Sequence, residues 1–592
     1  MVPGRFGWRT LAPKSAKRAY LMFTSLLFRV RIGQRLRAHL VAVVAGVLLA
    51  RPGAAQTWQW VTPIGTPAAY VSSTIADNAG NTYLSGAFTR QLAFPNTPPI
   101  FGDSSYFRTF VTKLNPAGDM LWTKVINGNP GGGVGATNTN VLALDPAGNV
   151  LLATTIWDSA YFDTTLVRSA ANGASTVLAK LDGQTGDWLW VTPAVGPGRN
   201  SISSIAVSPV GDVVVTGQFV DSVQLGSTRL VNVIRTGGIY SSLFVAGLSG
   251  NSGTWSFARC LTGEYNTDDA AVCADASGNV YLSATYSSLN LLSLGGFTLP
   301  AGAGPTKNSF VAKLNPLLGW QWVSALANTR RGDDVRCRAM TWNRTGRLVV
   351  AGSFNHTVTI GATTLQGSGL RSSRLFVAEI DTSGAWRWAT DNGAEDGSLG
   401  SQLFLAKYPA GGVVIAGKGT YGFGPLTFTP TTPAYQDVFV ALLDSARQWR
   451  WAVQARGSRG RVFNDGLAVD GAGQVTIAGY AESDSSFSFG SLVLADSGLF
   501  GARLSLPVVG LPAEARAAPP LQLWPNPAAT AAHVRGGRGP ATVRDALGRL
   551  VAMGPPDAAD ATADLLLDLR GLPAGFYIVQ RGLATQRLLV SL

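Results

Sequence analysis

The sequence predicts an all-β chain: a seven-bladed β-propeller closed by an N-terminal strand, followed by a small C-terminal β-sandwich of the immunoglobulin-like type. A unit of roughly 65 residues recurs seven times, its last copy lacks one strand motif, and the composition changes after Ser505. We therefore divide the chain into a signal peptide (1–55), a propeller (56–505), a Pro/Ala-rich linker (506–520) and a C-terminal domain (521–592).

The first motif of each unit is a hairpin turn followed by a strand. It reads Asp, two variable residues, Gly, a polar residue and then alternating apolar residues, as in residues 77–86. Asp accepts backbone hydrogen bonds at the start of a turn, Gly supplies the positive φ, and alternation has the period of a strand. The central glycines, 62 to 68 residues apart, are Gly80, Gly148, Gly211, Gly278, Gly346, Gly411 and Gly473.

Two further motifs complete each unit. Variants of Phe-Val-Ala-Lys-Leu recur from residues 110–114 to residues 500–504, and Trp-x-Trp strands recur, as at Trp188 with Trp190. Each unit therefore has four short strands, and such a sheet needs neighbours to bury both of its apolar faces. The Trp rings are expected to fill the wedge between neighbouring blades.

The two ends of the repeat region predict a closed ring. The seventh unit stops at Leu504 without its Trp-x-Trp strand, while Trp58 and Trp60 stand alone at the beginning of the region. Pairing of this N-terminal strand with the last blade would remove the open edge of the sheet. An open solenoid is the alternative, but solenoids need dedicated terminal caps.

The Asp-x-x-Gly-Asn, Phe-Val-Ala-Lys-Leu and Trp-x-Trp motifs together resemble the bacterial SBBP β-propeller repeats, over residues 58–504. This resemblance implies a propeller of surface or secreted proteins with no general enzymatic activity.

Positive charge is concentrated at the N-terminus. Residues 1–55 hold ten Arg or Lys and no acid, whereas the other 37 basic residues face 34 acidic ones. A near-neutral remainder lacks the basic surface that nucleic acid requires, so no nucleic-acid partner is predicted. The basic segment, the apolar run 40–50 and the small residues that follow are typical of a secretory signal cleaved between Ala55 and Gln56.

An uncleaved N-terminal anchor and a start at Met22 remain alternatives for this segment. No other stretch approaches 18 consecutive apolar residues, so no transmembrane span is predicted in the mature chain. We expect a monomer.

Residues 521–592 contain short apolar strands and turns that predict a small β-sandwich. Four motifs in order resemble the type A sorting domain of type IX secretion: an aromatic-Pro-Asn-Pro opening, a Val-x-Asp-x-x-Gly-Arg turn, a Leu-x-x-Gly-hydrophobic-Tyr strand and a final apolar strand. The resemblance implies export across the outer membrane by the type IX machinery. It leaves open whether the domain is then removed. The matching sorting residues are Trp524, Pro525, Asn526, Pro527, Asp545, Gly548, Arg549, Gly575 and Tyr577.

Few residues suit catalysis or metal binding, and no catalytic, cofactor or metal site is predicted. The mature chain holds two histidines, too few for a Ser-His-Asp triad within the propeller or a His-based metal site. Acidic residues that precede the first strands of blades have two interpretations. They would form a ring of carboxylates at one mouth of the central channel, which binds Ca²⁺ or a cationic group, or they would make hydrogen bonds in turns and at strand entries. The second interpretation is favoured because no dense calcium-loop spacing is present. These residues are Asp268, Asp269, Asp333, Asp334 and Asp465; the histidines are His356 and His533.

Cysteine and aromatic residues have mainly structural interpretations. Cys273 stands where other units have Ala, so we expect a buried free thiol rather than a disulfide with Cys260, which ends an outer strand. Aromatic residues predicted in inter-strand loops would form a carbohydrate platform or, as we favour, cover blade ends. They are Trp157, Tyr161, Tyr240 and Tyr421.

The sequence thus favours a secreted or cell-surface propeller that acts as a non-enzymatic binding or adhesion module for an extracellular glycan or protein. Two alternatives remain: an extracellular polysaccharide-acting enzyme with carboxylates at the channel mouth, and a purely structural surface protein. The identity of the ligand is not encoded in a recognisable motif.

Overall fold

The computed structural model describes residues 56–591 with gaps, so the predicted signal peptide (1–55, with Ala55 at the predicted cleavage site) and the predicted linker (506–520) lie outside the described residues. The gaps are 65–68, 103–106, 129–139, 171–173, 233–240, 266–268, 287–291, 300–306, 318, 327–332, 368, 370–372, 394–401, 420–421, 427, 429–436, 458–461, 483–486, 495–497, 506–520, 536–540, 546–549, 554–564 and 582–583.

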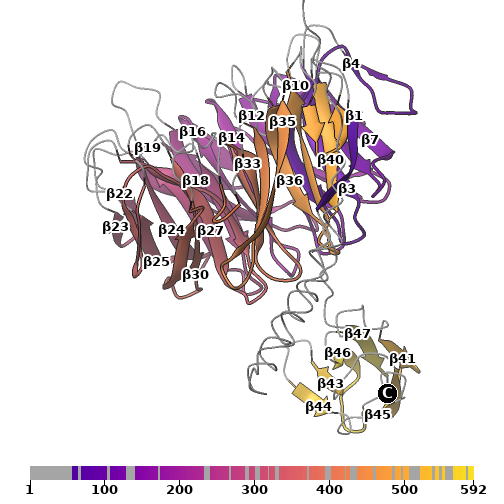
Figure 1. The fold of residues 1–592 in the computed structure, drawn as a ribbon. Helices are drawn as coiled ribbons and strands as arrows, with labels where there is room; N and C mark the ends of the chain where they lie inside the picture. Colours follow the sequence, from indigo (N-terminus) through magenta and orange to yellow (C-terminus); the bar gives the residue numbers. More distant parts are fainter. Residues whose placement is uncertain are drawn as a thin grey trace, which may run out of the picture. The chain divides into compact units, whose positions relative to one another are not determined.

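The chain is an all-β protein whose antiparallel sheets form a β-propeller (Figure 1). Each blade is named here by its first strand. The sheets are β2 (Ala69–Ala76), β3 (Thr82–Phe88), β6 (Arg108–Leu114) and β7 (Met120–Gly128); β8 (Val141–Leu144), β9 (Val150–Trp157), β12 (Ala174–Leu181) and β13 (Trp188–Ala194); β14 (Asn200–Val207), β15 (Val213–Phe219), β18 (Ser241–Leu248) and β19 (Trp255–Tyr265); β20 (Ala270–Ala274), β21 (Val280–Tyr286), β24 (Asn308–Asn315) and β25 (Gly319–Leu326); β26 (Val335–Trp342), β27 (Leu348–Phe354), β30 (Arg374–Ile380) and β31 (Trp386–Asp391); β32 (Leu403–Lys407), β33 (Val413–Lys418), β34 (Val438–Leu443) and β35 (Trp449–Gly457); and β36 (Val462–Val469), β37 (Val475–Ala481), β40 (Gly498–Ser505) and β1 (Thr57–Ile64).

Short hairpins extend or flank these sheets. Three of them continue the outer strands β7, β19 and β35. The hairpins are β10 (Ser159–Phe162) with β11 (Thr165–Arg168), β22 (Leu292–Leu294) with β23 (Phe297–Leu299), β38 (Phe487–Phe489) with β39 (Leu492–Leu494), β4 (Gln91–Leu92) with β5 (Ile100–Phe101), β16 (Ser222–Leu225) with β17 (Thr228–Val231), and β28 (Val358–Ile360) with β29 (Thr363–Leu365).

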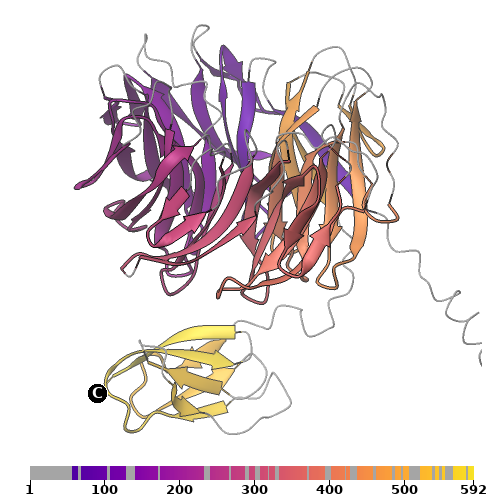
Figure 2. The same ribbon diagram turned by 90° about the vertical axis from the view of Figure 1, so that its left-hand side faces the viewer.

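The first strands of the sheets contact one another in a cycle. Strand β2 contacts β8, and the contacts continue through β14, β20, β26 and β32 to β36, which contacts β2 again. Figure 2 shows the sheets following one another around a central axis. These first strands are therefore the innermost strands of the propeller.

The ring closes through the N-terminal strand, as the sequence predicts. Strand β1 runs antiparallel to β40, with Trp58 opposite Leu504 and Pro63 opposite Phe500. Figure 1 shows indigo β1 beside orange β40 although the two strands stand at opposite ends of the repeat region. The pairing gives the outer edge of the last sheet a partner strand, which removes an unpaired edge.

The predicted hairpin chemistry is also present. The Asp77 carboxylate accepts hydrogen bonds from the backbone N–H groups of Ala79 and Asn81, at 3.0 and 2.9 Å, and Gly80 has a φ of 88°. Asp145 and Asp275 make the same two contacts in their own turns. Where Asp is present, it thus fixes the turn that connects the innermost strand to the next strand; Ser208, Asn343 and Tyr408 stand at this position in three other blades.

Burial explains why the middle strands are uniformly apolar. Strands β3 and β27 are buried at every position, because neighbouring sheets cover both of their faces. The Trp-x-Trp strands lie farther out, and in β31 Arg387 is exposed while the other residues are half-buried. Large indole rings therefore complete the core where the gap between sheets widens.

The C-terminal residues form two sheets around one hydrophobic cluster. One sheet orders β41 (Gln522–Trp524), β42 (Ala531–Arg535) and β45 (Leu565–Asp568); the other orders β44 (Leu550–Met553), β43 (Ala541–Arg544), β46 (Gly575–Arg581) and β47 (Ala584–Val590). Val534 and Leu567 from the first sheet share the cluster with Val543 and Val579 from the second. In the part of the chain that the structure describes, no helix is long and apolar enough to cross a membrane.

Candidate functional site

Neighbouring blades are joined by a repeated contact between a Trp and a glycine. The second Trp of an outer strand packs against a glycine in the next blade, in the turn between the third and fourth strands. At the β20/β26 junction the contact is so close that a Cβ on Gly384 would lie 2.8 Å from the Trp322 ring. The Trp322 Nε1 donates to the carbonyl oxygen of Thr382 in the same turn, at 3.0 Å. Trp60 and Trp190 make equivalent hydrogen bonds to turn carbonyls in their neighbouring blades. At Gly384 a side chain would therefore clash with the Trp ring, and the positive φ of 90° also favours glycine.

A buried lysine adds a second link at some junctions. Lys180, the lysine of its Phe-Val-Ala-Lys-Leu variant, donates from Nζ to the carbonyl oxygen of Gly250 in the next blade, at 2.7 Å. It also pairs with Asp145, at 2.8 Å. Lys113 reaches the carbonyl of Gly183 in the same way. The lysine thus ties one blade to the outer turn of the next.

The β26/β32 junction departs from both patterns. Glu379 of β30 occupies the lysine position, and a carboxylate cannot donate to a carbonyl. Arg447 occupies the glycine position in the β34–β35 turn, with a φ of 65°. The equivalent Trp388 donates a hydrogen bond to no residue of the described chain; the Arg447 guanidinium instead lies 5.8 Å from the centre of its ring.

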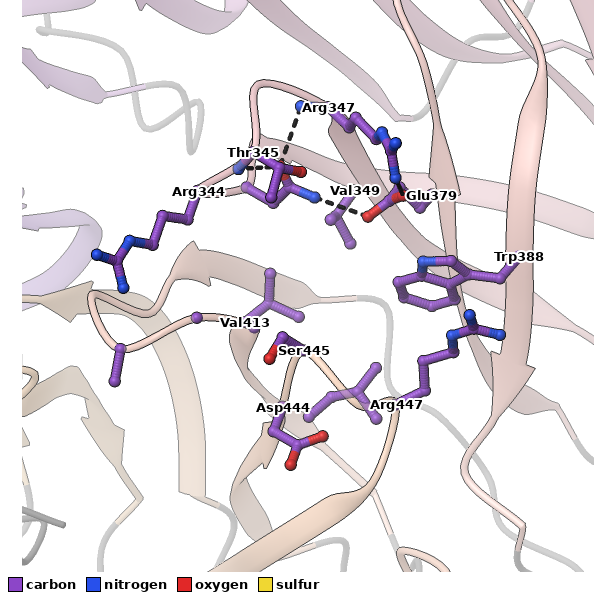
Figure 3. A pocket seen from close by; sticks show the side chains of 15 residues that line it. Arg344, Thr345, Arg347, Val349, Glu379, Trp388, Val413, Asp444, Ser445 and Arg447 are labelled. Atoms are coloured by element: carbon purple, nitrogen blue, oxygen red, sulfur yellow. Dashed lines mark hydrogen bonds and ion pairs between the residues drawn. The ribbon is translucent and has the colours of Figure 1, made fainter. Parts of the chain in front are cut away.

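A pocket of about 350 Å³ lies at this junction (Figure 3). Its walls come from three hairpin turns, β26–β27, β32–β33 and β34–β35, together with Glu379 of β30 and Trp388 of β31. The pocket therefore lies where the Trp–glycine contact and the lysine link are both replaced.

The charges in the pocket are partly paired. Glu379 accepts hydrogen bonds from Arg347, at 3.0 Å, and from the Asn343 side chain, at 2.7 Å. Asp444 pairs with Arg450, which approaches it from β35.

Two arginines in the walls have no acidic partner among the described residues. They are Arg344 and Arg447, and Figure 3 shows them on opposite sides of the pocket. Arg347 is paired with Glu379, and Asp444 is paired with Arg450. The charges of Arg344 and Arg447 therefore remain, and the walls carry an excess of positive charge. The pocket is suited to an anionic ligand.

The acidic residues singled out from the sequence do not form one carboxylate ring. Asp334 precedes β26 and accepts a hydrogen bond from the backbone N–H of Lys307, at 2.9 Å. Asp333 lies 3.5 Å from His356, and Asp269 lies 3.4 Å from the Arg338 guanidinium. The Asp334 contact agrees with the interpretation of strand-entry hydrogen bonding, whereas Asp269 and Asp333 each contact a basic side chain. Asp268 lies outside the described residues.

Asp465 was wrongly placed before the first strand of its blade. It lies inside β36, at the irregularity in register between Asn464 and Gly466. The extra residue at a β-bulge is not paired with the neighbouring strand. The alternation of apolar residues in the sequence does not reveal where such a bulge lies. Burial raises the pKa of Asp465 to about 6, although Gln402 and Lys418 act to lower it.

The cysteine prediction is confirmed. Cys273 is a buried free thiol on innermost strand β20, and Cys260 is a free, half-buried thiol on outer strand β19. Burial raises the pKa of Cys273 to about 12 and that of Cys260 to about 11.

Two of the four aromatic residues predicted in loops lie in strands instead. Trp157 ends β9 and Tyr161 lies in β10, because the segment between them turns tightly at Asp158, which has a φ of 60°. The Arg199 guanidinium lies 5.5 Å from the centre of the Trp157 ring, so one face of the ring is covered. Tyr240 and Tyr421 lie outside the described residues.

The sorting motif brings the first and last strands of the C-terminal region together. The Asn526 side chain accepts a hydrogen bond from the backbone N–H of Leu589, at 2.9 Å. Trp524 stacks on His533, with ring centres 5.4 Å apart. The Tyr577 hydroxyl donates to the carbonyl of Pro573, at 2.7 Å.

The other sorting residues are placed as follows. Pro525 and Pro527 flank Asn526 in the opening segment, and Gly575 begins β46. Asp545 follows β43, whereas Gly548 and Arg549 lie outside the described residues. Tyr577 and Asn526 thus each make a hydrogen bond within the C-terminal region.

Among the described residues, no group of three or more His, Cys, Asp or Glu side chains is arranged to hold a metal ion. Neither Glu379 nor Arg447 is singled out in the sequence analysis, which therefore does not predict this pocket. A position-by-position comparison of the repeats would reveal the pocket. Glu379 replaces the lysine, and Arg447 replaces the glycine, that other blades use at their junctions.

No protein-family model and no curated protein matches this chain. Similar solved structures include a protein of unknown function from Dyadobacter fermentans (10% identity, 77% of this chain and 100% of that chain, TM-score 0.37). Others are the β-propeller domain of the Trilobed protease from Pyrococcus furiosus (9%, 73% and 99%, 0.37) and a quinohemoprotein alcohol dehydrogenase from Comamonas testosteroni (10%, 76% and 76%, 0.33). At these identities and TM-scores the likeness carries no functional inference, and the propeller assignment rests on the chain's own strand pairing.

Proposed function

We propose that this chain is an exported, seven-bladed β-propeller protein that acts as a non-enzymatic binding or adhesion module, with the pocket at the β26/β32 junction as its binding site. The observation that carries the proposal is the replacement of two junction residues, Glu379 for lysine and Arg447 for glycine, around one pocket. The cycle of contacts among innermost strands and the pairing of β1 with β40 support seven blades.

The pairing of charges favours binding over catalysis. The Glu379 carboxylate is occupied by Arg347 and Asn343, and Asp444 is occupied by Arg450. A general acid or base needs a free position from which it can transfer a proton. Because its carboxylates are engaged in ion pairs and hydrogen bonds, the pocket offers groups that serve recognition.

A polysaccharide-acting enzyme is the second candidate, and one observation favours it. Asp465 on innermost strand β36 has a pKa raised to about 6 by burial, which suits a general acid or base. In this alternative, Asp465→Asn abolishes product formation while ligand binding at the β26/β32 junction persists.

Export is proposed to use both ends of the chain. Residues 1–55 would direct passage across the inner membrane, and residues 521–592 would engage the type IX machinery, leaving the protein at the cell surface or in the medium. The joining of the opening motif to the final strand, through Asn526 and Leu589, supports residues 521–592 acting as one folded unit.

Cell fractionation combined with a binding screen tests this function. The full chain is expected at the surface or in the medium, and a chain lacking residues 521–592 in the periplasm. The full chain should bind members of a glycan array or a set of matrix proteins without forming product. Surface delivery without residues 521–592 would contradict the sorting role, and turnover of a bound polysaccharide would contradict the non-enzymatic role.

A further inference from the structure

The β34–β35 turn contains a residue that its backbone conformation disfavours. Arg447 has a φ of 65°, and the corresponding Gly118 and Gly384 have φ values of 92° and 90°. All three donate the same turn hydrogen bond, from the backbone N–H to the carbonyl oxygen three residues earlier, so the positions are equivalent. A side chain in this region is strained, and strain of this kind gathers at functional sites.

The same substitution changes what lies against the neighbouring Trp. In the β20/β26 junction Trp322 packs on glycine and its Nε1 is bonded to a carbonyl. In the β26/β32 junction the Trp388 indole is half-buried in the pocket wall, beside the Arg447 guanidinium. An aromatic wall beside a cation can receive a ring that carries negative charge.

The polar groups of the pocket can form hydrogen bonds with hydroxyl groups of a ligand, in addition to binding an anionic group. The Ser445 hydroxyl forms no hydrogen bond to any described residue, and Asp444 presents a carboxylate from the same turn. The volume of about 350 Å³ lies at the lower end of the range for small-molecule sites, roughly 300–1,000 Å³. The ligand therefore combines a small polar ring, hydroxyl groups and an oxyanion.

We propose that the pocket at the β26/β32 junction binds an acidic sugar unit, one that carries a carboxylate or a sulfate group. Arg447, beside the Trp388 ring, holds the oxyanion, while Trp388 and Ser445 contact the sugar ring and its hydroxyls. Arg344 adds positive charge at the opposite rim of the pocket, where Figure 3 shows its side chain directed away from Arg447. This inference rests on the proposed binding function and names the ligand class of that site. No bond of the ligand is made or broken.

Titration calorimetry on the full chain tests the inference, with named probes. They are a tetramannuronate (carboxylate groups), a κ-carrageenan tetrasaccharide (sulfate groups), mannotetraose (neutral) and inorganic sulfate. At least one acidic tetrasaccharide should bind, at least tenfold more tightly than mannotetraose, with affinity falling as salt rises. Equal binding of mannotetraose, or binding of inorganic sulfate alone, would overturn the inference.

Single substitutions test whether the ligand binds in the pocket at the β26/β32 junction. Arg447→Gly restores the residue of the other blades, so the turn should fold unchanged, and affinity should fall roughly tenfold or more because a charged hydrogen bond is lost. Arg344→Ala should act in the same direction. Arg387→Ala is the matched control, since Arg387 lies on the same strand as Trp388, is exposed and pairs with Asp381 outside the pocket. Unchanged affinity in Arg447→Gly would overturn the assignment.

The outcomes separate this inference from the proposed function. If the acidic sugars fail to bind but another ligand from the screen binds and loses affinity in Arg447→Gly, the ligand class is wrong and the binding function stands. If nothing binds and a polysaccharide is turned over, both are wrong.

Discussion

The β20/β26 and β26/β32 junctions are built from the same repeat but end in different structures. In the first, Trp322 packs on Gly384 and donates to a turn carbonyl, so the ring leaves no room for a side chain at residue 384. In the second, Trp388 faces Arg447, and a pocket lies between the blades. The comparison shows that the same repeat makes a close Trp–glycine contact at one junction and lines a pocket at the next, where two residue positions differ.

The largest expected effect comes from removing a buried lysine link. Lys180→Met should destabilise the fold by about 3–5 kcal/mol, because Asp145 keeps its buried charge without its cationic partner. Urea denaturation followed by Trp fluorescence measures the change. The matched control is Glu379→Gln at the same motif position, which should cost less than about 1 kcal/mol because Arg347 is largely solvated. Equal losses in the two variants would refute the distinction between the junctions.

A second prediction converts the closed junction toward the open one. Gly384→Arg should destabilise the fold by about 2–4 kcal/mol, since its Cβ would lie 2.8 Å from the Trp322 ring. The control is Gly148→Arg, where φ is 85° but no atom lies within 4 Å of the added Cβ; backbone strain alone should cost about 1–2 kcal/mol. Both are measured by urea denaturation, and a smaller loss for Gly384→Arg would count against the packing argument.

The third prediction compares two buried carboxylates across pH: Asp145, whose pKa its partners lower, and Asp465, whose pKa burial raises. Burial alone would raise the pKa of Asp145, but bonds from Lys180 and Asn149 lower it below its ordinary value, so its stabilising effect is lost as pH falls through the acid range. Asp465 has a pKa raised to about 6, so between about pH 4 and 6 the unfolded chain has already lost the proton that the folded chain retains.

Asp465 therefore lowers stability as pH rises over this window, by on the order of 1–3 kcal/mol. Asp465→Asn should remove this decline. Urea titrations at pH 4, 5, 6 and 7 measure it, and parallel pH profiles for the variant and the parent chain would show that Asp465 is not perturbed.

Much of this fold was accessible from the sequence because local chemistry repeats. The Asp77 turn and the pairing of Trp58 with Leu504 follow from residue types at fixed spacing. The bulge at Asp465 was not accessible, since a register irregularity depends on packing between sheets. The pocket was not recognised because Glu379 and Arg447 gain meaning only from the contacts that their equivalents make across a junction.

The smallest stability effect is expected at the pocket itself. Arg447→Gly should leave the free energy of unfolding within about 1 kcal/mol of the parent chain, because relief of left-handed strain offsets the greater entropy of the unfolded glycine. Urea denaturation measures this value. A loss above about 2 kcal/mol would mean that Arg447 supports the fold rather than the site.

The most direct test of the central claim is a crystal structure of the double variant Glu379→Lys/Arg447→Gly, which restores both junction residues. We predict that the pocket closes, with the Trp388 Nε1 or the introduced lysine donating to the Ser445 carbonyl oxygen, as the equivalent groups do at Thr382 and Gly250. A pocket that keeps its volume, with Trp388 still unbonded, would contradict the claim that these two residues open it.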